Sequence, residues 1–168
     1  MTPAESAQIL GASGEAISNL LGSLPAEIAS QRPAENEWCV NECVGHLIEA
    51  ERRGFAGRIK TMLDESEPLL VAWDAADVEK ARGDCDRDLR GLLREFTSLR
   101  RDSVELVRSL QPADLGRVGV HPVVSRITVE VILHEWVHHD ANHLRQALAN
   151  VQTFMWPAMG ATQRFSSG

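Results

Sequence analysis

Apolar residues recur every three or four positions in four long stretches of the chain, which is the period of an amphipathic helix. This pattern predicts helices over residues 4–24, 40–62, 89–110 and 129–151. Nothing alternates between apolar and polar for long enough to indicate a sheet. Helices of about 20 residues are each about 30 Å long and can pack side by side. The sequence therefore predicts an all-α protein, a four-helix bundle.

The second and third predicted helices are joined by a long acidic stretch, residues 64–86, which contains Trp73 and shows no sustained period. We expect a long crossover there, with room for one short helix. Thr128 is a suitable N-cap for the last helix. The bundle is expected to occupy residues 1–151, with residues 152–168 as a C-terminal tail.

Composition fits one ordinary domain and excludes several partners. The chain has 168 residues, of which 43% are hydrophobic, and a formal charge of −7. This acidic balance argues against binding to nucleic acid or to an anionic membrane surface. No apolar run is long enough to cross a membrane, and the start of the chain lacks a secretory signal. Three cysteines without framework spacing fit a reducing compartment, so we expect a cytoplasmic protein.

Two histidine pairs follow one another in the last predicted helix: His134 with His138, and His139 with His143. Residues four apart lie one above the other on a helix, so either pair could offer two imidazoles to one metal ion. On a helical wheel, His139 and His143 border the apolar face, whereas His134 and His138 point towards solvent. The second pair is therefore the better candidate.

The first pair gives a competing interpretation, because His134-Glu135-Trp136-Val137-His138 matches the H-E-x-x-H string of zinc proteases. Such enzymes commonly take a third ligand from further along the chain. Residues 144–168 contain no His, Asp or Glu, and the extended protease motif also fails. The string alone is a weak basis for a protease.

Asp140 points nearly into the middle of the apolar face, where an unpaired carboxylate is costly. It should have a partner, for which the candidates are the Trp38 indole, a backbone N–H group or an arginine. The competing interpretation is an ordinary carboxylate at a bundle end, open to water.

Two further groups have both a functional and an ordinary interpretation. Cys39, Cys43 and His46 form a C-x3-C-x2-H string that could bind a metal, but cysteines one turn apart more often pack as small hydrophobic residues. His121, next to a proline in a loop, is either an additional ligand or acid–base group, or an ordinary surface histidine.

Several of these residues occur in a familiar arrangement. Trp38 is followed eight residues later by His46-Leu47, and the last helix carries His139-x-x-x-His143-Leu144-x-Gln146. With these motifs, the chain resembles the DinB-like superfamily over nearly its whole length. The resemblance implies a four-helix bundle that binds a divalent metal through His46, His139 and His143. The wheel supports only the last two, because His46 lies off the centre of its apolar stripe.

The resemblance also implies a function. Three neutral nitrogens with open positions are the arrangement of a catalytic metal site, with zinc or nickel as the expected ion. Some relatives use a low-molecular-weight thiol, which implies an S-transferase or isomerase acting on a small molecule. The alternatives are a metal-dependent hydrolase and a stress-related metal-binding bundle without catalysis. Glu49 and Asp140 are the candidates for a second catalytic group, and a homodimer is the default assembly for such bundles.

One position departs from the family pattern. Many relatives carry a serine where Cys39 stands, at the expected start of the second helix, and a thiol is a poor helix cap. This departure affects helix stability more than the metal site.

Overall fold

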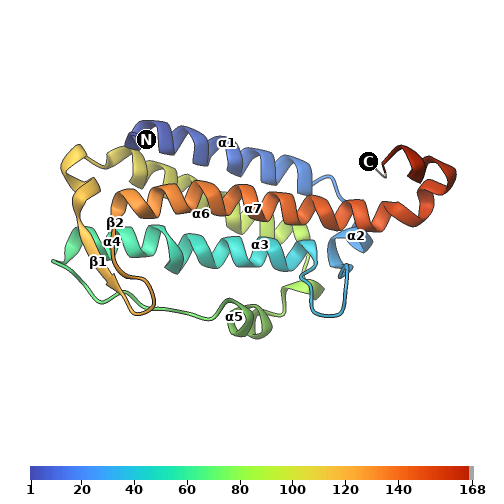
Figure 1. Cartoon of the computed structure of the whole chain (residues 1–168), viewed down its shortest axis with the longest axis horizontal. Helices are drawn as coiled ribbons and strands as arrows, with labels where there is room; N and C mark the ends of the chain where they lie inside the picture. Colours follow the sequence, from blue (N-terminus) through green and yellow to red (C-terminus); the bar gives the residue numbers. More distant parts are fainter. Residues whose placement is uncertain (167–168) are drawn as a thin grey trace.

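Four helical rods lie side by side in the computed structural model, which describes residues 1–166 (Figure 1). The rods are α1 (Pro3–Leu21), α3 (Val40–Glu49) with its continuation, α6 (Leu89–Ser109) and α7 (Val129–Met155). Both α1 and α3 pack against α6 and against α7. The predicted four-helix bundle is therefore confirmed. None of the helices within residues 1–166 has the length and apolar character needed to cross a bilayer.

Shorter elements lie between the rods, within the second rod and after the last one. These are α2 (Ala26–Ser30), α5 (Ala75–Arg82), β1 (Val118–His121), β2 (Ser125–Thr128) and four further short helical segments, η1 (Ala50–Gly54), η2 (Asp84–Asp86), η3 (Pro112–Gly116) and η4 (Trp156–Phe165). The predicted crossover between the second and third rods is present, and it runs beside α3 with α5 in its middle (Figure 1). The antiparallel β1–β2 hairpin was not predicted, because strands of four residues are too short to show alternation.

Side chains that accept hydrogen bonds fix where the rods begin. The Thr2 hydroxyl accepts from the backbone of α1, and Thr128 does the same for α7, as predicted. Asp88 caps α6. Cys39 is the N-cap of α3, where the carboxylate of Glu42 accepts the Cys39 backbone N–H at 2.8 Å. This hydrogen bond is one half of a capping box, and in the other half the Glu42 backbone N–H donates to the Cys39 side chain.

The second predicted helix is not continuous. A π-helical turn, η1, separates α3 from α4 (Ala56–Asp64), and the Phe55 N–H donates to the Ala50 carbonyl at 2.8 Å. A π-helical turn changes the register of the side chains that follow, and such turns are frequent at functional sites. At the other end of the bundle, α7 extends to Met155, four residues beyond the predicted end of that helix. The expected homodimer and the division of the chain at residue 151 stay predictions.

The hydrophobic core consists of two clusters with a polar layer between them. One cluster includes Leu10, Ile59 and Trp136, and the other includes Ile17 and Phe96. Separate apolar clusters allow a buried polar group to lie within the bundle without interrupting the packing of either. That group is an arginine of α6, described below.

Candidate metal centre

Three histidines meet between α3 and α7. His46 comes from α3, and His139 and His143 come from successive turns of α7. Each offers a ring nitrogen, and these nitrogens all lie within 4.8 Å of one another. The Nε2 atoms of His46 and His139 are 2.9 Å apart. The structure thus brings together all three histidines that the sequence singled out.

Hydrogen bonds identify the nitrogens that face the centre of the cluster. The Nδ1 atom of His143 lies 2.9 Å from Gln146 Oε1, so an Nδ1–H group donates there and Nε2 keeps a lone pair. Within residues 1–166, the Nδ1 atoms of His46 and His139 are buried without hydrogen-bond partners, and their Nε2 atoms face each other. Facing lone pairs repel, so the close Nε2 pair needs a proton or a cation between them. This donor set fits a divalent metal ion.

Aromatic rings surround the cluster. The Trp38 ring centroid lies 4.9 Å from that of His46, and Trp73, from the crossover, lies 5.5 Å from the same ring. The Phe55 ring meets His139 edge-on at 5.0 Å. No sequence pattern pointed to Phe55 or Trp73, because the π-turn and the path of the crossover bring them here. Together the rings limit the access of water to the imidazoles.

This environment keeps the imidazoles neutral. Burial, together with the neighbouring charge of His143, lowers the pKa of His46 to about 3. Burial and the other two histidines lower the pKa of His139 to about 2, and burial also lowers the pKa of His143. Because a metal ion binds neutral imidazole, it has no protons to displace from these rings near neutral pH.

Asp140 lies in the core, paired with an arginine. The Nη1 atom of Arg100 is 2.5 Å from Asp140 Oδ2, and its Nη2 atom is 2.9 Å from Oδ1. The Ser13 hydroxyl donates to the same carboxylate. The arginine partner was among the predicted candidates, whereas the alternative of a carboxylate open to water is wrong, because Asp140 is only 1% exposed.

Arg100 also binds a second carboxylate. Its Nε and Nη2 atoms lie 2.8 and 2.5 Å from Glu51 Oε1, which also accepts from the Trp136 indole at 3.2 Å. Burial acts to lower the pKa of Arg100, but Asp140 and Glu51 outweigh it and raise that pKa. Burial raises the pKa of Glu51 against the opposing effect of Arg100. This buried network joins α6, α7 and the π-turn beside the histidine cluster.

A glycine makes room for the network. The predicted first helix runs through Gly14 without a break, although glycine is a weak helix former. A Cβ atom at this position would lie 2.8 Å from Cγ of Arg100. The arginine side chain therefore passes directly over the α1 backbone.

The other candidate groups lie outside the histidine cluster. Glu49 is buried and pairs with Arg82 at 2.6 Å and with two arginines of η1, so it fastens the crossover to α3. His134 and His138 are exposed, as the wheel predicted. His121 Nε2 lies 3.1 Å from Nη2 of Arg58.

The structure does not bring Cys39, Cys43 and His46 together as one metal site. Cys43 is fully buried and, within residues 1–166, belongs to neither group of potential metal ligands. Cys39 instead lies with Glu42 and with Cys85, from the far end of the crossover. The thiolate interpretation built on Cys39, Cys43 and His46 is therefore wrong.

A groove of about 570 Å³ opens beside the histidine cluster, with His143 and Trp38 in its wall. Its other polar wall residues include Asn142, Arg145 and Gln146. These amide and guanidinium groups provide both donors and acceptors of hydrogen bonds. The groove can therefore hold a small polar molecule next to one of the three imidazoles.

The fold and the cluster define a four-helix bundle with a three-histidine centre between two of its rods. Residues 10–147 match the family model of the DinB superfamily, and the chain belongs to that superfamily. The uncharacterized protein YuaE of Bacillus subtilis (strain 168) is 29% identical over 139 residues, which are 76% of this chain and 86% of that protein.

A solved structure has the same architecture. It is YfiT from Bacillus subtilis, described as "a probable metal-dependent hydrolase with an unusual four-helix bundle topology". The TM-score is 0.82 at 20% sequence identity, and the match covers 90% of this chain and 87% of that one. At this identity the likeness shows the shared fold.

Proposed function

We propose that His46, His139 and His143 hold one divalent metal ion and that the protein is a metal-dependent enzyme acting on a small polar molecule. The observation that carries the proposal is the convergence of three neutral ring nitrogens within 4.8 Å, beside a groove of about 570 Å³. Three protein ligands leave a coordination position open, as in catalytic sites. Zinc and nickel both suit imidazole ligands.

A bound divalent ion would supply Lewis acidity and would lower the pKa of a coordinated water or thiol towards neutrality. The protein's own residues would do the rest. Gln146 orients His143 through its Nδ1–H group, and the aromatic rings of Trp38, Phe55 and Trp73 restrict bulk water. The polar side chains of the groove would orient the substrate through hydrogen bonds.

The nucleophile separates two reaction classes. With water the reaction is hydrolysis, the activity named for the structural relative YfiT. With a low-molecular-weight thiol it is S-transfer or isomerisation, as expected from the family resemblance. The groove's polar wall is compatible with both, because its amide and guanidinium groups offer hydrogen bonds. We favour hydrolysis as the first activity to test.

Metal analysis tests the centre itself. The native protein, His143→Ala and His134→Ala are purified without a histidine tag, loaded with Ni²⁺ and desalted. His134 lies on the same helix but is exposed, so it is the matched control. We expect His143→Ala to lose one nickel ion per chain and His134→Ala to lose none. Equal nickel content in all three proteins would reject the centre.

An activity screen tests catalysis. The metal-loaded and chelator-treated proteins are compared on a panel of esters and amides, and on bacterial thiols with an electrophile. We expect metal-dependent hydrolysis that His143→Ala abolishes and His134→Ala retains. Turnover only with a thiol would assign the transferase or isomerase class. Silence across both panels, with the metal bound, would place the protein among non-catalytic metal-binding bundles.

A further inference from the structure

A second group of potential metal ligands lies at the start of α3. It consists of Cys39, the N-cap residue, Glu42 in the first turn, and Cys85 in the η2 turn. One ligand atom from each lies within 4.8 Å of the others. Cys39 and Glu42 are buried, and Cys85 is half-buried. Cys39 and Glu42 come from the start of α3 and Cys85 from the far end of the crossover, and the fold brings these two segments together.

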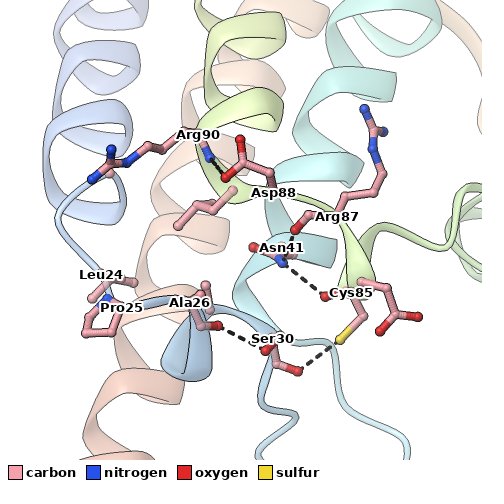
Figure 2. Close-up of a pocket in the computed structure, with 13 residues that line it drawn as sticks. Leu24, Pro25, Ala26, Ser30, Asn41, Cys85, Arg87, Asp88 and Arg90 are labelled. Atoms are coloured by element: carbon pink, nitrogen blue, oxygen red, sulfur yellow. Dashed lines mark hydrogen bonds between the residues drawn. The ribbon is translucent and has the colours of Figure 1, made fainter.

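Ligand atoms within 4.8 Å of one another are near the separation that a tetrahedral ion requires. Zinc binds a thiolate at about 2.3 Å and a carboxylate oxygen at about 2.0–2.2 Å, which places neighbouring ligand atoms about 3.3–3.8 Å apart. A further oxygen is close, because the Sγ atom of Cys85 donates to the carbonyl oxygen of Ser30 at 3.0 Å (Figure 2). Two sulfurs and at least one oxygen favour a soft or borderline divalent cation over magnesium or calcium.

The charge around the group also favours a cation. Arg32 pairs with Glu42, but Glu79 lies beside the same carboxylate. Glu79 adds a second carboxylate next to the proposed ligand, 3.7 Å from the same arginine. Glu42 keeps lone pairs for an ion while it accepts from Arg32 and from the Cys39 N–H, since a carboxylate has about four acceptor sites.

Both cysteines of the group are free thiols. A bound cation would hold them as thiolates, because thiolate is the form that it binds. An ion can reach the group from outside, since Cys85 lines a surface pocket of about 580 Å³ (Figure 2).

We propose that Cys39, Glu42 and Cys85 form a second metal site, for a soft divalent cation of the zinc class. It is distinct from the histidine centre, because Cys39 precedes His46 by seven residues, about 10 Å along α3. An ion here joins the far end of the crossover to the first turn of the helix that carries His46. It stabilises the folded protein by an amount that grows with the logarithm of the free ion concentration above the Kd, because the unfolded chain does not hold the three ligands together.

Cadmium titration tests the site, because cadmium bound to thiolate absorbs in the ultraviolet and cadmium bound to imidazole does not. Fully reduced protein is titrated with Cd²⁺ as the native chain, Cys85→Ser, Cys39→Ser and Cys43→Ser. Cys43 is the matched control, as a buried cysteine of the same helix outside the group. Serine is a good helix cap, so Cys39→Ser keeps the start of α3.

We expect the thiolate absorption in the native chain and in Cys43→Ser, and its loss in Cys85→Ser and Cys39→Ser. His143→Ala should lose the ion of the histidine centre and keep the absorption, which separates this proposal from the proposed function. Cd²⁺ should also raise the thermal midpoint of His143→Ala but not that of His143→Ala/Cys85→Ser. No absorption in the reduced native chain, or equal absorption in Cys85→Ser, would overturn the second site.

Discussion

The buried histidines make the stability of the metal-free protein depend on pH. The pKa of His46 is about 3 and that of His139 about 2, because both rings are buried, whereas each titrates near 6.5 in an unfolded chain. The unfolded chain therefore binds more protons than the folded protein as the pH falls below about 6.5. The two neutral rings therefore leave the free energy of unfolding undiminished above about pH 6.5, and they lower it progressively as the pH falls below that value.

The size of the effect follows from the pKa differences. One pKa unit corresponds to about 1.4 kcal/mol, so by about pH 5 each ring has lowered the unfolding free energy by about 2 kcal/mol. Glutamine does not titrate, so His46→Gln/His139→Gln removes this dependence. Between about pH 7.5 and pH 5, we expect the native protein to lose about 4 kcal/mol more than the double variant.

Urea unfolding in the presence of a chelator, followed by far-ultraviolet circular dichroism, measures this difference at the two pH values. The control is His134→Gln/His138→Gln, which removes two exposed histidines of α7. This control should lose as much stability as the native protein. If His46→Gln/His139→Gln loses stability in parallel with the native protein, the histidines do not titrate as buried neutral groups, and the reasoning is refuted.

Two further substitutions test the packing around the site. Arg100→Met leaves two carboxylates buried without their cation and should lower the unfolding free energy by about 3–5 kcal/mol, measured in urea. The control is its exposed neighbour, since Arg101→Met should change the unfolding free energy by less than about 0.5 kcal/mol. Equal losses in the two variants would contradict the network. Gly45→Ala places a methyl group against the carboxylate of Asp84 and should cost about 1–3 kcal/mol. Gly11→Ala adds a Cβ atom that meets none of the described residues within 4 Å and should instead stabilise α1. Equal effects of the two substitutions on thermal unfolding would exclude the close approach at Gly45.

The periodicity of single helices was enough to predict the four rods and two of the three histidines of the site. One wheel separated His139 and His143 from His134 and His138, because a helix fixes which side chains share a face. His46 is different. It lies off the apolar stripe of its own helix, so only the family resemblance pointed to it, and its half-buried position depends on how α3 packs against α7.

Contacts between distant segments could not be predicted in the same way. Nothing local marks Arg100 as the partner of Asp140, because the pairing depends on the relative rotation of α6 and α7. Likewise, Cys39 and Cys85 are 46 positions apart and meet only because the crossover returns to the start of α3. The π-turn is hidden because its residues fit an ordinary helix as well as a wide one.

The buried layer of Arg100, Glu51 and Asp140 is not explained by its contribution to stability. A buried ion pair can often be replaced by well-packed apolar residues without loss of stability, so Arg100, Glu51 and Asp140 are better explained by the geometry that they impose. Asp140 follows His139 directly, and we infer that its bidentate pairing with Arg100 sets the rotation of α7 that turns His139 and His143 towards His46.

An apolar replacement of the whole layer, Glu51→Leu/Arg100→Met/Asp140→Leu, separates the two roles. We expect a folded protein whose unfolding free energy is well above that of Arg100→Met, because no carboxylate is left buried without a partner. Its nickel affinity, measured by calorimetry, should nevertheless fall by about 10–100-fold, the cost of losing groups that orient metal ligands. Native nickel affinity in a stable triple variant would show that helix packing alone orients the histidines.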